Sequence, residues 1–121
     1  MHARAANAYR KGDLESAPKH LVLERLFDRF DRDLVQAREA IAAKDIQRKA
    51  NLLDHALRIV AELTAALDHA VAPELCANLA ALYEFVTVRL GEANTTLAVQ
   101  PLDEAAKLMA EIGAAFKQAH R

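Results

Sequence analysis

The stretch that decides the fold is Pro73–Asn94, which reads PELCANLAALYEFVTVRLGEAN. A proline suits the first turn of a helix because the N–H that it lacks would have no partner there, and the acidic Glu74 complements the helix dipole. Apolar residues then recur at steps of three and four, the spacing of one helix face. They are Leu75, Leu79, Leu82, Val86, Leu90 and Ala93. The stretch therefore predicts a helix that packs against a core.

A second row on the same helix is unusual. At about 100° per residue, Asn78, Ala81, Phe85 and Val88 lie on a side well away from the first row. A bundle helix with one buried face does not need Phe85 and Val88 in those positions. We expect either another part of the chain or a partner to cover them.

Three further helices are expected around this one. The first begins near Ser16, a candidate N-cap, and continues to about Ala43. The second begins after the N-cap Asp45, runs over about 46–70, and has a second apolar row beside its main seam. The last begins near Leu102, after a stretch without periodicity at 95–101. The second apolar row of the helix expected over about 46–70 comprises Leu52, Ala56, Ile59, Leu63 and Ala66.

Length and composition favour a single all-α domain. The chain has 121 residues, 53% of them apolar and 5% aromatic, with 3 glycines, a balance that favours helix over strand. Residues 1–15 carry no sustained period and are interpreted as a mobile leader, while residues 16–121 form the helical domain. Short connections between helices predict an antiparallel up-down four-helix bundle, which the leader is able to cap.

Charge and cysteine content narrow the class of protein. The formal net charge is -1, with 16 basic and 17 acidic residues, so no strong field directs the chain to nucleic acid or an anionic membrane. The single Cys76 excludes an internal disulfide and is compatible with a reducing cytosol. No apolar run reaches the length of a membrane span, and no signal peptide is recognised. We therefore expect a cytoplasmic protein without membrane insertion.

The histidines, glutamates and single cysteine of the chain are not spaced as catalytic or metal-binding sites require. No glutamate has a histidine three residues later, and no His-Glu-x-x-His occurs, so the histidines are interpreted as surface residues and no metal or cofactor is expected. His55 precedes Ala-Leu-Arg, not the x-x-Lys-Gly of phosphotransfer domains. Cys76 has no basic neighbour in sequence and is interpreted as an inert core thiol. The sequence predicts no catalytic residue and thus no enzyme.

The central stretch resembles a known family. Asn78-Leu79, Leu82-Tyr83 and Phe85, followed by Arg89-Leu90 and Ala93-Asn94, are similar to the most recognisable segment of the FliS family, the cytosolic flagellin export chaperones. The match extends through 44–68 and Leu102-Asp103-Glu104 to Phe116, and Tyr9 looks like the N-terminal tyrosine of the family. Two residues depart from it: Arg25 stands where methionine is customary, and Arg29 where glycine is typical.

The resemblance implies a chaperone that holds the disordered C-terminal segment of flagellin in the cytosol. It would prevent premature polymerisation and keep flagellin competent for flagellar type III export, without catalysis, with export-apparatus components as further partners. An amphipathic tail can lay helices into apolar grooves. Asn78 would satisfy backbone groups of the tail, and Tyr9 would fold over the empty groove. The predicted partner-binding residues are Tyr9, Leu52, Ile59, Leu63, Asn78, Phe85, Val88 and Leu108.

Two alternatives stay open at this point. The extra apolar rows also suit a homodimer, or a non-catalytic helical adaptor for another secretion partner. Tyr83 falls within the buried arc of its helix, where a core tyrosine is favoured over a direct contact with a ligand.

Overall fold

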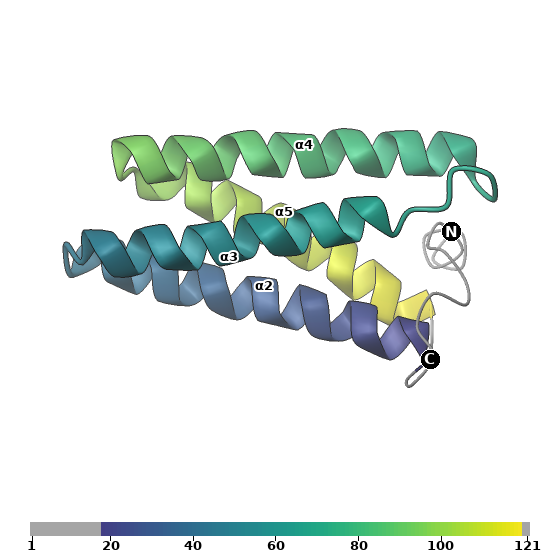
Figure 1. Ribbon diagram of the computed structural model, residues 1–121, viewed down its shortest axis with the longest axis horizontal. Coiled ribbons are helices and arrows are strands. Elements are labelled where there is room, and N and C mark those ends of the chain that lie inside the picture. The colour runs from purple at the N-terminus through teal and green to yellow at the C-terminus, as the bar shows by residue number, and fades with distance from the viewer. Residues whose placement is uncertain (1–17, 120–121) are drawn as a thin grey trace.

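Four helices make up the part of the chain that the computed structural model describes, residues 18–119 (Figure 1). They are α2 (Lys19–Ala42), α3 (Ile46–Ala65), α4 (Pro73–Thr96) and α5 (Val99–Ala119). Successive helices run in opposite directions, which confirms the predicted all-α four-helix bundle. The leader at 1–15 and the expected N-cap Ser16 lie outside the described residues.

Two helix starts are where the sequence places them. The Asp45 carboxylate accepts a hydrogen bond from the backbone N–H of Arg48 at 3.2 Å, which is the N-cap interaction expected at the start of α3. Pro73 occupies the first turn of α4. Both signals are local, because each residue acts on the N–H groups of its own first turn.

Two helix ends differ from the prediction. The α3 helix ends at Ala65, because the Asp68 carboxylate accepts from the Ala70 N–H at 3.1 Å and directs the chain into a turn. The α5 helix already begins at Val99, and Pro101 lies in its first turn, where a missing N–H costs nothing. Leu97 takes a left-handed conformation with φ 59°, which ends α4 abruptly.

The helices are arranged so that α3 lies between α2 and α4. The α5 helix crosses behind this layer and contacts α2 and α4 (Figure 1). All four helices contribute to one core, and burying each large side chain stabilises the fold by about 1.5–3 kcal/mol relative to exposure. The largest fully buried side chains include Phe30, Leu53, Leu63, Tyr83, Leu90 and Phe116.

Polar contacts join the helices at the end of the bundle that holds the α2–α3 and α4–α5 connections. Lys49, 4% exposed, donates from Nζ to the backbone oxygen of Asn94 at 2.9 Å and to its Oδ1 at 2.6 Å. This places a cation at the C-terminal end of α4, where the helix dipole favours it. At the same end, Arg38 pairs with Asp103 at 3.0 Å. These contacts fix α3 against α4 and α2 against α5.

Candidate partner-binding surface

A groove of about 700 Å³ runs between α3 and α4 and is here named the α3–α4 groove. Alanines at 61, 65 and 80 leave it open because their side chains are short. The hydroxyls of Thr64 and Thr87 donate to carbonyl oxygens of their own helices, so they present little unmet polarity to a guest. The groove is lined by Leu57, Val60, Ala61, Thr64, Ala65, Ala80, Tyr83, Glu84 and Thr87.

The outer face of α4 is also apolar. Phe85 is 48% exposed and Val88 55% exposed, with Asn78 exposed on the same face. The opposite face of α4 packs into the core through Leu79, Tyr83, Val86 and Leu90. The α4 helix is therefore apolar on both faces, and exposed apolar surface of this kind is typical of interaction sites in soluble proteins.

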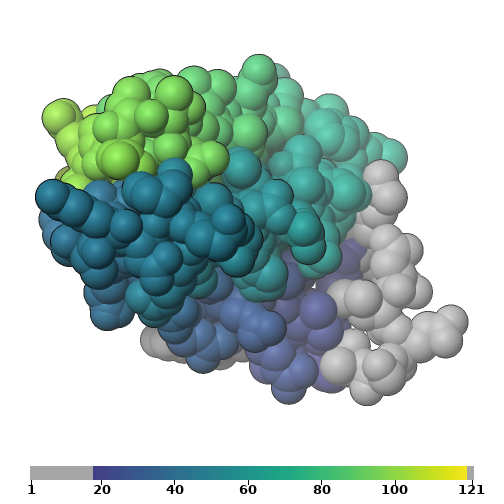
Figure 2. Space-filling model, turned by 60° about the vertical axis from the view of Figure 1, so that its left-hand side comes forward, coloured from purple at the N-terminus to yellow at the C-terminus, as the bar shows by residue number. Residues whose placement is uncertain are grey.

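A second groove, of about 520 Å³, lies on the other side of α3 and is here named the α2–α3 groove. Figure 2 shows α3 between α2 and α4 on one face of the molecule. The lining of this groove is mixed, with apolar residues at its floor and charged residues at its rim. The lining residues are Val22, Arg25, Leu26, Arg29, Arg32, His55, Arg58, Ile59 and Glu62.

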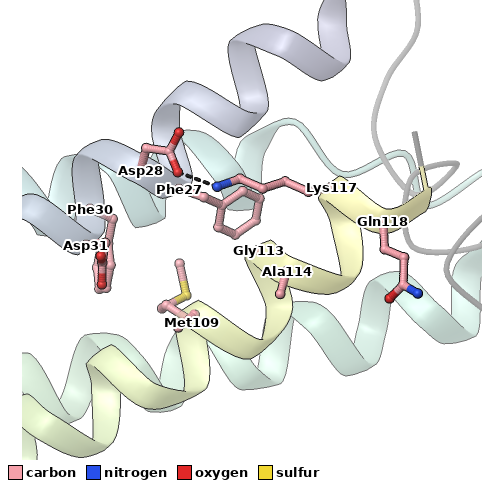
Figure 3. A pocket seen from close by; sticks show the side chains of 10 residues that line it. Phe27, Asp28, Phe30, Asp31, Met109, Gly113, Ala114, Lys117 and Gln118 are labelled. Carbon is pink, nitrogen blue, oxygen red and sulfur yellow. Dashed lines mark hydrogen bonds and ion pairs between the residues drawn. The ribbon is translucent and has the colours of Figure 1, made fainter. Parts of the chain in front are cut away.

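A third hollow, of about 450 Å³, lies between α2 and α5 (Figure 3). An ion pair between Asp28 and Lys117 bridges the two helices there. Gly113 allows the close approach of α5, because a Cβ at this position would lie 3.1 Å from the Phe27 ring. Phe27 in turn packs on Phe116, with ring centroids 5.9 Å apart. The ion pair thus spans this hollow, and the volume of the hollow is smaller than that of either groove.

Comparison with known proteins decides the family. The sequence model described as "Flagellar protein FliS" matches residues 1–121. The chain belongs to the FliS family. It is 33% identical to the flagellar secretion chaperone FliS of Salmonella typhimurium, over 96% of this chain and 90% of that protein. Identity to FliSB of Pseudomonas aeruginosa is 34%, over 90% of each chain, and identity to FliS of Escherichia coli is 31%, over 96% and 89%.

Membership of the FliS family confirms the resemblance found in the sequence. FliS proteins are chaperones and not enzymes, and the chain is accordingly a flagellar export chaperone. Among residues 18–119, no three His, Cys, Asp or Glu side chains are grouped closely enough to hold a metal ion. In the same range no helix combines the length and the apolar character needed to cross a membrane.

The predicted partner-binding residues of this FliS chain do not form one surface. Asn78, Phe85 and Val88 share the outer face of α4. Ile59, 4% exposed, lies at the α2–α3 groove instead. Leu63 is fully buried, so a contact through its side chain requires the bundle to open. Leu52 and Leu108 are half-buried against the core, and Tyr9 lies outside the described residues.

The α3–α4 groove itself was not predicted. Ala61, Thr64, Ala80 and Thr87 line it, and small or hydroxyl side chains give no apolar signal in a periodicity analysis. One signal was available: small residues recur on facing sides of the two helices, where their lack of bulk leaves space. Tyr83 is buried, as predicted for a core tyrosine, although its ring also borders the groove.

Cys76 is a buried thiol at the start of α4, with its Sγ 3.3 Å from the backbone oxygen of Asp68. Burial, and then the negative charge of Asp68, raise the pKa of this thiol above its ordinary value. The sulfur therefore stays protonated near neutral pH and is a poor nucleophile, in agreement with the interpretation as an inert core thiol.

Proposed function

We propose that this chaperone binds the C-terminal segment of flagellin in the cytosol, in the α3–α4 groove and on the outer face of α4. Binding there keeps the segment from polymerising before flagellar type III export. The observation that carries the proposal is the exposure of Phe85 and Val88 on α4, a helix that also forms one wall of the α3–α4 groove through Ala80, Tyr83 and Thr87. Anchors spaced at i, i+3, i+4 and i+7 on an amphipathic guest helix suit such a groove.

This function requires enough buried apolar area to offset the free-energy cost of ordering the guest segment. Ordering a disordered segment costs about 2–5 kcal/mol of the gross interaction energy. At about 25 cal/mol per Å² of apolar surface removed from water, roughly 200 Å² must be buried to offset the upper figure. The outer row of α4 and the groove together offer aliphatic and aromatic surface for that burial, and Glu84 is the one charged side chain among the groove-lining residues.

The remaining predicted contacts have secondary roles in the proposal. Asn78 is exposed on the same face of α4 and offers an amide to backbone groups of the guest. Further apolar contact with the guest comes from the solvent-exposed edges of Leu52, Leu108 and Ile59. Leu63 supports α3 from within the core, and Tyr9, which lies outside the described residues, stays a predicted cover of the empty groove.

Titration calorimetry with a flagellin C-terminal peptide tests the proposal. Phe85→Asp places a charge in the apolar contact and is expected to weaken binding at least about 10-fold. Val35→Asp is the matched control, because Val35 is 56% exposed but lies on α2. Equal affinities for Phe85→Asp and the parent chain, with the binding heat capacity also unchanged, would remove the outer face of α4 from the site.

Light scattering over a concentration series separates the chaperone from a homodimer that uses the same row. We expect a monomer in the absence of guest and a complex with flagellin at one copy of each chain. A dimer that dissociates in Phe85→Asp, and that does not bind the flagellin peptide, would assign the outer face of α4 to self-association.

A further inference from the structure

Over residues 25–32 the helix α2 sorts its charged side chains by sign. Arg25, Arg29 and Arg32 line the α2–α3 groove, whereas Asp28 and Asp31 line the hollow between α2 and α5. The spacing of the arginines, four and then three residues, keeps them on one face of the helix. In this part of α2 the two sides of the helix therefore differ in charge, although the whole chain is nearly neutral.

The arginines on the groove side are not neutralised by the rest of the described chain. Within residues 18–119, none of Arg25, Arg29 and Arg32 takes part in an ion pair, and all three are exposed. The acidic Asp28 on the other side is already bound by Lys117.

The α3 side of the rim does not cancel this charge. Arg58 pairs with Asp54 at 2.6 Å, and His55 contacts Asp33 at 2.5 Å. Glu62 is then the one carboxylate among the groove-lining residues, against the three arginines of α2. The rim of the α2–α3 groove keeps a positive excess that a guest can use.

The floor of the groove limits what can occupy it. Val22, Leu26 and Ile59 are aliphatic, and no Phe, Tyr or Trp lines the groove to stack nucleic-acid bases, although His55 is among the lining residues. A guest must therefore combine an apolar face with carboxylates beside it. Arginine favours that chemistry, because its guanidinium binds a carboxylate through two parallel hydrogen bonds.

We propose that an acidic amphipathic helix of the export guest itself docks in the α2–α3 groove, with its carboxylates on Arg25, Arg29 and Arg32. The inference rests on the proposed function and adds the chemical class of a second guest segment. A helix rises about 1.5 Å per residue, so carboxylates at steps of three and four on the guest match the arginines on α2.

The position of α3 argues that one guest chain fills both grooves. The helix separates them by its own diameter, about 10–12 Å, which three or four extended residues span at about 3.3 Å each. A second segment tethered this closely acts at an effective concentration on the order of millimolar, so modest arginine contacts add measurably to affinity.

The experiment titrates a flagellin C-terminal segment into the parent chain, Arg25→Gln/Arg29→Gln and Lys44→Gln/Lys107→Gln, at about 50 mM and about 500 mM NaCl. The lysine variant is the matched control: it removes the same charge from exposed positions that do not line the groove. We expect the parent chain and the control to lose about 10-fold in affinity at high salt. The arginine variant should bind about 10-fold more weakly at low salt and depend little on salt.

The possible outcomes separate a failure of this inference from a failure of the proposed function. If Arg25→Gln/Arg29→Gln binds with the parent affinity and salt dependence while Phe85→Asp binds more weakly than the parent chain, the acidic segment is refuted and the flagellin function stands. If the parent chain itself does not bind the segment, both proposals fall. A single-stranded RNA that binds the parent chain more tightly than flagellin does, and that the arginine variant releases, assigns the groove to nucleic acid and overturns the inference. Circular dichroism confirms that each variant is folded.

Discussion

The α2–α3 and α3–α4 grooves share one wall, the helix α3, and differ in the chemistry of the other wall. Their volumes are similar, about 520 Å³ and about 700 Å³. Both use α3, which turns Ile59 and Arg58 to one side and Leu57 and Ala61 to the other. The second wall makes the difference, because α2 contributes arginines where α4 contributes alanine, threonine, one glutamate and the edge of a tyrosine.

This difference teaches that the depth of a groove does not define its guest. An apolar groove gains affinity from buried area, which is non-directional and insensitive to salt. In a groove with a charged rim, oriented ion pairs fix the register of the guest and select among guests. Their contribution to binding weakens as salt screens the charges. A chaperone that holds a long disordered segment can use the first for affinity and the second for choice of guest.

The largest expected effect comes from blocking one groove and leaving the others open. Ala61→Arg places a long side chain in the α3–α4 groove and should weaken the binding of a flagellin segment about 100-fold, since it removes the space for apolar anchors. Ala110→Arg is the control, because Ala110 is an exposed alanine at the hollow between α2 and α5. Calorimetry that gives equal affinities for the two variants would contradict the assignment of the guest to α3–α4.

A smaller effect is expected from loosening the α3–α4 pair at its end. Lys49→Met removes the charge-assisted hydrogen bonds to Asn94 and should lower the free energy of unfolding by about 1–2 kcal/mol. The α2–α3 groove has no part in this contact, so its geometry should persist. Denaturant unfolding of Lys49→Met beside Lys107→Met, an exposed lysine on α5, measures the difference. Equal midpoints would show that the contact does not hold the two helices together.

The smallest effect is expected at Cys76. Its raised pKa and full burial predict slow reaction with a thiol reagent in the native protein and fast reaction after unfolding. Because the thiolate is the reactive form, the native rate should increase only at a pH above the range for a free thiol. Saturation with the flagellin segment should not change the rate. Acceleration by the guest would mean that α3 and α4 separate on binding, and would give buried Leu63 a direct contact.

The fold follows from the sequence to a large extent, because its signals are local or periodic. Asp45 caps α3 and Pro73 begins α4 where they were expected, and the apolar faces place Leu53, Tyr83 and Leu90 in the core. The end of α3 was wrong by several residues, because the turn depends on how Asp68 bonds to Ala70 and not on periodicity. The start of α5 was also wrong, because residues 95–101 lack apolar periodicity although the last three of them form the first turn of α5, which accepts Pro101.

The candidate site followed only in part. Phe85 and Val88 were identified because a large apolar residue away from the main seam stands out in the pattern. Ile59 and Leu63 belong to the same apolar row in the sequence, but one borders the α2–α3 groove and the other is sealed in the core. A row wide enough for two neighbours looks the same whether a second helix or a guest covers it.

The sequence by itself determined the helices, the core and the family, since each is encoded by residues close together along the chain or by a motif read directly. Only the tertiary structure decided which side of α3 faces which neighbour, and so which groove is apolar and which is lined by arginine. It also showed that Lys49 and Asn94, 45 residues apart, bind each other. The physical reason is that a groove is made by two helices at once, and its chemistry depends on how they are rotated against each other.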